Sequence, residues 1–196
     1  MHDAMRTSSL TMQIRWVHVE RMTKLALLLL AIPAIATASP LHADAELDPT
    51  AYALSGYSLH VGIGYQRLRV DAGNFALAVP GWVHGNDAFD VAFDGYGAKL
   101  QLFPLAEQRG LVVGVDAAYT RVLVERRGTQ MAVRDGQLQA GVNVGWRFPI
   151  VDRLYATAWL GIGRAFGARD VTLGDATFRP SRTVVFPAIH VGYAFR

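Results

Sequence analysis

The chain ends in Val184-Val-Phe-Pro-Ala-Ile-His-Val-Gly-Tyr-Ala-Phe-Arg196, where alternate side chains differ in character. One set is wholly apolar and ends in two aromatics: Val185, Pro187, Ile189, Val191, Tyr193 and Phe195. The other set is mostly small or polar: Phe186, Ala188, His190, Gly192, Ala194 and Arg196. A period of two predicts a β-strand whose two faces meet different surroundings. Lipid outside and a lumen inside would satisfy this pattern, and so would one strand of a soluble β-sandwich.

Five earlier blocks repeat the alternation, and short and long links separate them. The blocks are residues 57–66, 95–102, 111–120, 137–148 and 154–163. The links alternate long and short: Arg67–Asp87, Pro104–Arg109, Glu125–Asp135, Pro149–Arg153 and Gly167–Arg182. Outer-membrane barrels have short periplasmic turns and longer extracellular loops, whereas a sandwich has no reason to segregate its loops by length. The pattern therefore favours an all-β, antiparallel up-and-down transmembrane barrel over a soluble β-domain. With a periplasmic N-terminus, the first block runs outward and the three longer links are extracellular.

Aromatic residues bracket the apolar faces, as interfacial girdles do. The motif Val-Gly-aromatic-x-Phe ends two blocks, at Val144–Phe148 and Val191–Phe195. This repetition predicts that the two motifs lie at the same level along the barrel axis. The predicted girdle comprises Tyr57, Tyr65, Tyr119, Trp146, Phe148, Tyr193 and Phe195. One irregularity precedes the second block, because Phe89, Val91 and Phe93 occupy the opposite parity. We expect a bulge or a change of surroundings near Asp94.

The N-terminal part of the chain has the order of a secretion signal. The apolar run Leu25–Ala36 follows Lys24 and is too short for a good transmembrane helix. Two small-residue cleavage sites follow, Ala36-Thr37-Ala38 and Ala43-Asp44-Ala45. Counted from Met22, the second site gives the more usual signal length, so residues 1–21 look like an over-long start. The predicted division is residues 1–45 for this start and signal, and residues 46–196 for the barrel.

Composition narrows the functional classes. The 196 residues suffice for one domain and include no cysteine, so an exported form has no disulfide framework. The sequence pI is near 9.4, yet the segment after Ala45 is close to neutral and has Lys99 as its only lysine. Export and near-neutral charge argue against a nucleic-acid partner. The sequence also contains no phosphate loop, zinc motif or nucleophile elbow.

From Tyr57 onward the chain resembles the small outer-membrane barrels of the OmpA/OmpX type, also called opacity or porin-like proteins. The resemblance rests on the architecture and on Val191-Gly-Tyr-Ala-Phe195, which looks like the family's C-terminal assembly signal, although Arg196 follows the terminal Phe. It implies a Gram-negative outer-membrane location, contact with outer-membrane lipid, and recognition of the last strand by the barrel-assembly machinery. A monomer is expected. Eight strands are expected, with two more hidden in Ala51–Ser55, Phe75–Val83 or Val171–Arg179.

The predicted lumen carries polar side chains that need partners. They are His60, Lys99, Gln101, Asp116, Gln139, Asn143, Arg147 and His190. Lys99 and Asp116 lie on adjacent blocks joined by a short link, which predicts an ion pair. His60 and His190 are expected to approach because the first and last strands close the barrel. With Ser58 nearby, a Ser–His hydrolase or a two-His metal site is conceivable, but the predicted position at the periplasmic end lies away from outer-leaflet lipid.

Three functions remain open at this point. The first is a non-catalytic structural or surface-interaction barrel without metal or cofactor. The second is a narrow pore for small solutes or ions, and the third is a lipid-modifying enzyme. The bulky lumen residues Tyr155, Trp159 and Phe186 argue against an open channel. The first function is therefore the expectation, with the pore as its alternative.

Overall fold

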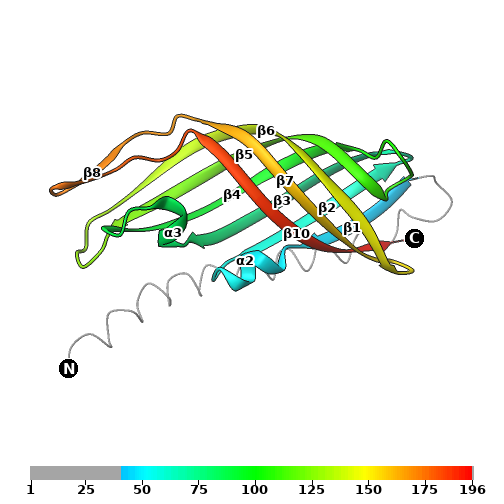
Figure 1. Cartoon of the computed structure of the whole chain (residues 1–196), viewed down its shortest axis with the longest axis horizontal. Helices are drawn as coiled ribbons and strands as arrows, with labels where there is room; N and C mark the ends of the chain where they lie inside the picture. The colour runs from blue at the N-terminus through cyan, green and yellow to red at the C-terminus, as the bar shows by residue number, and fades with distance from the viewer. Residues whose placement is uncertain (1–40, 196) are drawn as a thin grey trace, which may run out of the picture. The chain divides into compact units, whose positions relative to one another are not determined.

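A computed structural model describes residues 41–195, which form a closed antiparallel barrel of eight strands in the order β1-β10-β7-β6-β5-β4-β3-β2 (Figure 1). The strands are β1 (Leu41–Leu47), β2 (Tyr57–Tyr65), β3 (Leu68–Val79), β4 (Phe89–Leu102), β5 (Gly110–Arg126), β6 (Ala132–Val151), β7 (Leu154–Phe166) and β10 (Thr183–Phe195). Two short helices, α2 (Pro49–Ala53) and α3 (Gly81–His84), and a separate hairpin, β8 (Val171–Leu173) with β9 (Ala176–Phe178), lie in the links. The predicted fold class and the count of eight strands are confirmed. Within residues 41–195, neither helix is long or apolar enough to cross a membrane.

The alternation in the sequence corresponds to the two faces of the barrel wall. On β6, Leu138 and Val142 point outward and are 60% and 55% exposed, whereas Asn143 and Arg147 point inward and are buried. Successive side chains of a strand point to opposite faces, so a closed sheet sorts them into an outside and a lumen. The outside is apolar and the lumen is charged, which is the reverse of a soluble protein.

Two of the eight strands lie mostly where the sequence predicted a signal or a loop. β1 includes residues 41–45 of the segment assigned to the signal, and β3 falls in the predicted long link Arg67–Asp87, so the assignments of residues 41–45 and 68–79 are wrong. The stretch Asp71-Ala72-Gly73-Asn74 has turn-like composition, but its polar side chains belong to the lumen face of a strand. Of the three candidate segments for extra strands, Ala51–Ser55 is largely α2 and Val171–Arg179 contains the β8–β9 hairpin. Only Phe75–Val83 overlaps a barrel strand, at the end of β3.

The predicted domain boundary at residue 46 also falls inside the barrel. β1 begins at Leu41 and pairs with both β2 and β10, so the barrel needs residues upstream of Ala45 for its closure. A start at Glu46 would leave only the last two residues of this strand. The predicted signal, including Leu25–Ala36, lies outside the described residues, and so does Arg196.

The links divide into two groups at opposite ends of the barrel. The terminal end has the first residue of β1, the last residue of β10, and links 66–67, 103–109 and 152–153. The loop end has links 80–88, 127–131 and 167–182, with α3 and the β8–β9 hairpin (left in Figure 1), whereas link 48–56 with α2 returns the chain partway along the wall. The links near Pro104–Arg109 and Pro149–Arg153 share one end as predicted, and those near Glu125–Asp135 and Gly167–Arg182 share the other. The predicted direction of the first block is wrong, because β3 follows β2 through a tight turn and β2 runs toward the terminal end.

One part of the wall is completed by a helix rather than by a strand. β1 pairs with β10 only from Val191 onward, whereas β10 pairs with β7 from Thr183 onward. Helix α2 packs against β2, β3 and β10 there, and the amide of Ala78 donates to the carbonyl of Leu54 (3.2 Å). Pro187 lies in this part of β10, in agreement with the restriction of proline to sheet edges. The sheet is therefore closed by hydrogen bonds near the terminal end and by α2 further along.

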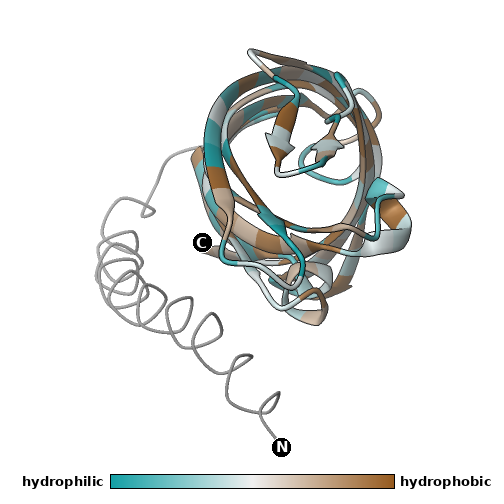
Figure 2. Ribbon diagram, turned by 90° about the vertical axis from the view of Figure 1, so that its left-hand side faces the viewer, coloured by the Kyte–Doolittle hydropathy of each residue, from teal (hydrophilic) through white to brown (hydrophobic). Residues whose placement is uncertain are grey.

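The β8–β9 hairpin projects from the loop end of the barrel (left in Figure 1). Figure 2 shows the two short strands within the outline of the ring. The hairpin packs apolar side chains against those of β4 and β5, forming a buried cluster: Phe89, Val91, Val124, Val171, Leu173 and Phe178. The bulge suggested near Asp94 is absent from the register of β4 with β3 and β5. The inward face instead changes from polar to apolar where it meets the hairpin.

Candidate functional site

Arg69 of β3 is the centre of a buried ionic network in the lumen. Its guanidinium donates from Nε and Nη2 to the two oxygens of Asp44 (2.9 and 2.5 Å), and from Nη1 to Oε1 of Gln101 (2.7 Å). Nη1 also lies 3.0 Å from Oδ2 of Asp71, and Nη2 lies 3.3 Å from Oε2 of Glu46. All these residues are nearly inaccessible to solvent. A buried guanidinium is tolerated because its fork meets carboxylates on both sides.

Glu46 of β1 connects this network to a second one. Its Oε1 accepts from Nη2 of Arg147 (2.9 Å), and its Oε2 lies 3.0 Å from Nδ1 of His190. Arg147 also donates from Nε to the hydroxyl of Thr157 (3.1 Å). The two oxygens of Glu46 therefore connect β1 with side chains of three other strands, β3, β6 and β10.

Two aromatic rings enclose Arg147 at the terminal end of the lumen. The guanidinium carbon lies 4.1 Å from the ring centroid of Tyr155 and 4.8 Å from that of Phe103. These are cation–π distances, and Phe103 is completely buried. The three side chains form a cap across the terminal end, which we call the Arg147 cap.

Lys99 does not form the predicted ion pair with Asp116. The two residues are direct cross-strand neighbours in the β4–β5 register, but Nζ of Lys99 lies 3.2 Å from Oδ1 of Asp71 on β3. Asp116 instead accepts a hydrogen bond from Nδ2 of Asn143 (3.0 Å). Among residues 41–195, no oxygen of Asp116 lies within 4 Å of Nζ of Lys99. The prediction failed because β3 was taken for a loop, so its carboxylate was not available as a partner.

His60 and His190 do approach each other, with ring centroids 4.9 Å apart. The predicted reason was wrong, because β1 lies between β2 and β10 and the two rings meet across it, inside the lumen. Nδ1 of His60 lies 2.9 Å from Oδ1 of Asp71, and its Nε2 lies 3.1 Å from the hydroxyl of Ser58. The connectivity is that of a Ser–His–Asp triad. However, Asp71 is shared with Lys99 and Arg69, and Ser58 is only 6% exposed.

The other predicted lumen residues also face inward. Gln101 belongs to the Arg69 network, Asn143 pairs with Asp116, and Gln139 is half-buried nearer the loop end. Within the described part of the chain, no group of three or more His, Asp or Glu side chains is arranged to hold a metal ion. A cavity of about 20 Å³ lies at the loop end, lined in part by Val122, Phe178 and Pro180. It is large enough for about one water molecule.

Sequence reasoning missed the four residues at the centre of the lumen. They are Asp44, Glu46, Arg69 and Asp71, and all lie on the two unpredicted strands. The signal was present in the alternation of charged residues with Ala43, Ala45 and Leu47 in β1, and with Leu68 and Val70 in β3. Such charged alternation is what a polar lumen produces.

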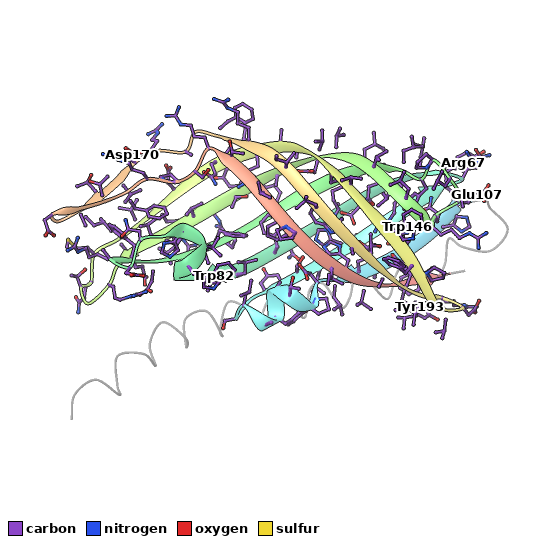
Figure 3. The ribbon with its side chains drawn as sticks, in the orientation of Figure 1. Arg67, Trp82, Glu107, Trp146, Asp170 and Tyr193 are labelled. Atoms are coloured by element: carbon purple, nitrogen blue, oxygen red, sulfur yellow. The ribbon has the colours of Figure 1, made fainter. Side chains whose placement is uncertain are left out.

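An apolar band with aromatic borders surrounds the outside of the barrel. At the terminal end, four members of the predicted girdle are 43–49% exposed, and Trp146 and Tyr193 are seen there in Figure 3: Tyr65, Trp146, Phe148 and Tyr193. Phe195 is half-buried, with its ring 5.4 Å from that of Tyr193. Tyr119 lies toward the loop end, with its ring 5.6 Å from that of Tyr96. Tyr57 was wrongly placed in the girdle: it is 8% exposed, in the region of β2 against which α2 packs.

Charged residues mark the border of this apolar band on the side of the loop end. Arg121 bonds to Asp94 one step beyond the Tyr96–Tyr119 pair, and Arg134 lies 3.8 Å from the same carboxylate. Along β6, the apolar face from Phe148 to Leu138 covers about 25 Å of depth for a strand tilted by about 40°. That is the height of the apolar band of outer-membrane barrels.

Three solved structures similar to this chain are a major outer membrane protein, a surface protein and a β-barrel domain. Each shares 13% identity with it. A major outer membrane protein from Thermus thermophilus aligns over 79% of this chain and 98% of its own, with a TM-score of 0.50. Neisserial surface protein A aligns over 80% and 97%, with a TM-score of 0.47. The N-terminal barrel domain of Pseudomonas aeruginosa OprF aligns over 79% of this chain and 96% of its own, with a TM-score of 0.42. No protein-family model and no curated protein matches the chain.

The fold is that of a small outer-membrane β-barrel. The expected resemblance is confirmed at this level, because the closed eight-stranded ring and the Thermus likeness agree. An exposed apolar band around a closed barrel is a lipid-facing surface. The predicted location, the bacterial outer membrane, agrees with this fold and its band.

Three layers of side chains follow one another along the lumen of this outer-membrane barrel fold. The Arg147 cap lies at the terminal end, the Arg69 network lies further in, and the apolar cluster with the β8–β9 hairpin lies at the mouth. Between the last two, Trp159 and Phe186 place their rings 5.8 Å apart. Such an arrangement stabilises a closed barrel, because each buried charge has a partner and each end has an aromatic or apolar layer.

Proposed function

We propose that the protein is a non-catalytic outer-membrane barrel with a structural and surface-interaction role, whose loop end faces the outside. The observation that carries this proposal is the filling of the lumen in three successive layers. A permeation path would have to pass the Arg147 cap, the Arg69 network and the apolar cluster. Separating the partners in a buried ionic network leaves uncompensated charges, which is strongly unfavourable.

Conductance of planar bilayers tests this proposal. The wild-type protein, inserted from detergent, is expected to give no discrete current steps. A variant in which a short Gly-Ser link replaces residues 170–179 removes the hairpin, and it should also be silent because the two inner layers remain. Current steps from the wild-type protein would contradict the proposal.

A narrow pore is the second candidate, and one observation favours it. The middle of the lumen is charged rather than apolar, as in pathways that carry ions. If the wild type conducts and Lys99→Met changes its ion selectivity, the charged network lines a path and the pore becomes the function. Heat-modifiable gel migration of the same samples verifies that the barrel is folded in each case.

The partners follow from this proposal. We expect outer-membrane lipid around the apolar band and the barrel-assembly machinery at β10, with its terminal pattern Val191-Gly-Tyr-Ala-Phe195. A monomer is favoured, since the wall closes on itself without a second chain. Nucleic acid is not expected as a partner.

A further inference from the structure

In the described barrel, residues 41–195, one arginine lies on the lipid-facing wall without an acidic partner. Arg164 of β7 is exposed on the outward face between Ile162 and Phe166, and its cross-strand neighbours are Ala140 on β6 and Thr183 on β10. Its surroundings on this wall are apolar and 51–60% exposed: Leu138, Val142, Ile162, Phe166 and Val185. Arg164 is therefore a single charge set in an apolar surface.

The other outward arginines near this level are compensated. Arg121 and Arg134 both approach the carboxylate of Asp94. Among residues 41–195, no carboxylate oxygen lies within 4 Å of the Arg164 guanidinium. Asp170, labelled at the loop end in Figure 3, lies 3.5 Å from Nε of Arg179 and forms its ion pair there.

The height of Arg164 corresponds to the border between hydrocarbon and headgroups. Its cross-strand neighbour Ala140 lies two residues from Leu138 on β6, close to where the apolar face of that strand ends. A guanidinium is costly within hydrocarbon but favourable at the interface, where a long side chain can reach an anion. With the loop end outside, this interface belongs to the outer leaflet.

We propose that Arg164 binds the phosphate group of an outer-leaflet lipid whose acyl chains lie on the surrounding apolar wall. The proposal rests on the proposed function, because it requires a barrel in the outer membrane. A guanidinium fits a phosphate with two parallel hydrogen bonds, and its charge complements that group. Free phosphate would gain nothing from Leu138, Ile162 or Val185, so the apolar surroundings favour a lipid.

Native mass spectrometry of the refolded protein in detergent tests the proposal. The probes are lipid A, a diglucosamine lipid with two phosphates, and its dephosphorylated form. We expect the wild type to retain lipid A at least about tenfold better than the dephosphorylated form, a ratio within reach of one charge-assisted pair. Arg164→Gln should lose about this factor, and Arg164→Lys should keep part of it. Arg169→Gln removes the same charge from an exposed loop residue and should behave as the wild type.

Each opposite outcome overturns the proposal. Equal retention of the two lipids, unchanged retention by Arg164→Gln, or an equal loss in Arg169→Gln would show that Arg164 does not recognise a lipid phosphate. Complete release of lipid A by millimolar inorganic phosphate would assign the site to free phosphate instead. Heat-modifiable migration is measured on every variant. A wild type without it refutes the barrel itself, whereas a folded barrel without lipid discrimination refutes only this inference.

Discussion

At the residue scale, Asp71 shows how one carboxylate can organise a lumen. It lies within 3.2 Å of the guanidinium of Arg69, the ammonium of Lys99 and the imidazole of His60. Its side chain is completely buried, so water does not screen these contacts. In a site of low dielectric, such a shared anion stabilises several neighbours together. Substitution at Asp71 should therefore affect the barrel more than substitution at any one of its partners.

We predict that Lys99 is coupled to Asp71 and not to Asp116. Asp71→Asn should lower the free energy of unfolding by about 3–5 kcal/mol, because it leaves buried cations uncompensated. The losses of Lys99→Met and Asp71→Asn should not add, since they remove the same ion pair. Lys99→Met and Asp116→Leu serve as the matched control, and their losses should come closer to adding because no ion pair joins these two neighbours. Urea unfolding in lipid vesicles measures all of these, and coupling only to Asp116 would contradict the prediction.

The Ser58–His60–Asp71 contact makes a second residue-scale prediction. Ser58 is buried in the closed lumen, so we expect it not to react with a fluorophosphonate probe, and the protein not to hydrolyse p-nitrophenyl esters above background. Ser58→Ala should leave both results unchanged. Labelling that maps to Ser58 and disappears in Ser58→Ala would establish the hydrolase that the proposed function excludes.

At the element scale, β1 and the β8–β9 hairpin are the parts that close the barrel. β1 lies between β2 and β10 and contributes Asp44 and Glu46 to the lumen. The hairpin contributes apolar side chains to the mouth. β1 therefore completes the wall and the ionic network, and the β8–β9 hairpin covers the apolar cluster nearer the loop end.

We predict that signal cleavage follows Ala38 rather than Ala45. Cleavage after Ala45 would remove Asp44 together with most of β1, whereas cleavage after Ala38 leaves the strand intact. Loss of Asp44 would also remove both of its bonds to Arg69. N-terminal sequencing of the mature protein should therefore begin at Ser39. A sequence beginning at Glu46 would contradict the structure of β1.

The hairpin prediction concerns Phe178, which is 5% exposed and packs its ring 5.8 Å from that of Phe89. Phe178→Ala should destabilise the closed mouth by about 3 kcal/mol, the lower end for loss of a buried aromatic side chain. Because the eight strands remain paired, the loss should be local. Limited trypsin digestion in vesicles should cut near Arg169 and Arg179 much faster than in the wild type, while heat-modifiable migration stays unchanged. Loss of that migration would show that the hairpin supports the whole barrel.

At the scale of the whole molecule, the barrel has two unlike ends. The terminal end has tight links and a dense aromatic border, whereas the loop end carries longer links, α3 and the hairpin. β5 and β6 have 17 and 20 residues, more than the roughly 9–11 that cross a membrane, so they extend beyond the apolar band at the loop end. This asymmetry is the basis of the proposed orientation.

Protease added to intact cells tests that orientation. We predict cleavage in links 127–131 and 167–182, where exposed arginines lie outside the band, and none in links 103–109 and 152–153. Disrupting the outer membrane should then allow cleavage at Arg109 and Arg153. The reverse order of cleavage would place the terminal end outside.

The sequence alone determined the strands whose two faces differ strongly. In β6 and β10, a period of two is a local property, and an apolar face beside a small or polar face needs no knowledge of neighbours. The lumen positions of Lys99, Arg147 and His190 followed from that parity, as did most of the girdle. The terminal aromatic pattern likewise indicated the kind of protein before any contact was known.

Only the tertiary structure decided which partners these residues have. Pairing of β3 with β4 places Asp71 directly opposite Lys99, and closure of the ring brings Glu46 of β1 to Arg147 of β6 across the lumen. The alternation of charged and apolar residues marked both strands, but their composition hid them, because charged side chains on a buried face resemble those of a turn or a leader segment. In a soluble protein such charges would indicate the surface, whereas a barrel surrounded by lipid turns its polar face inward. Partner choice inside a barrel therefore depends on strand pairing and on closure, which no local pattern contains.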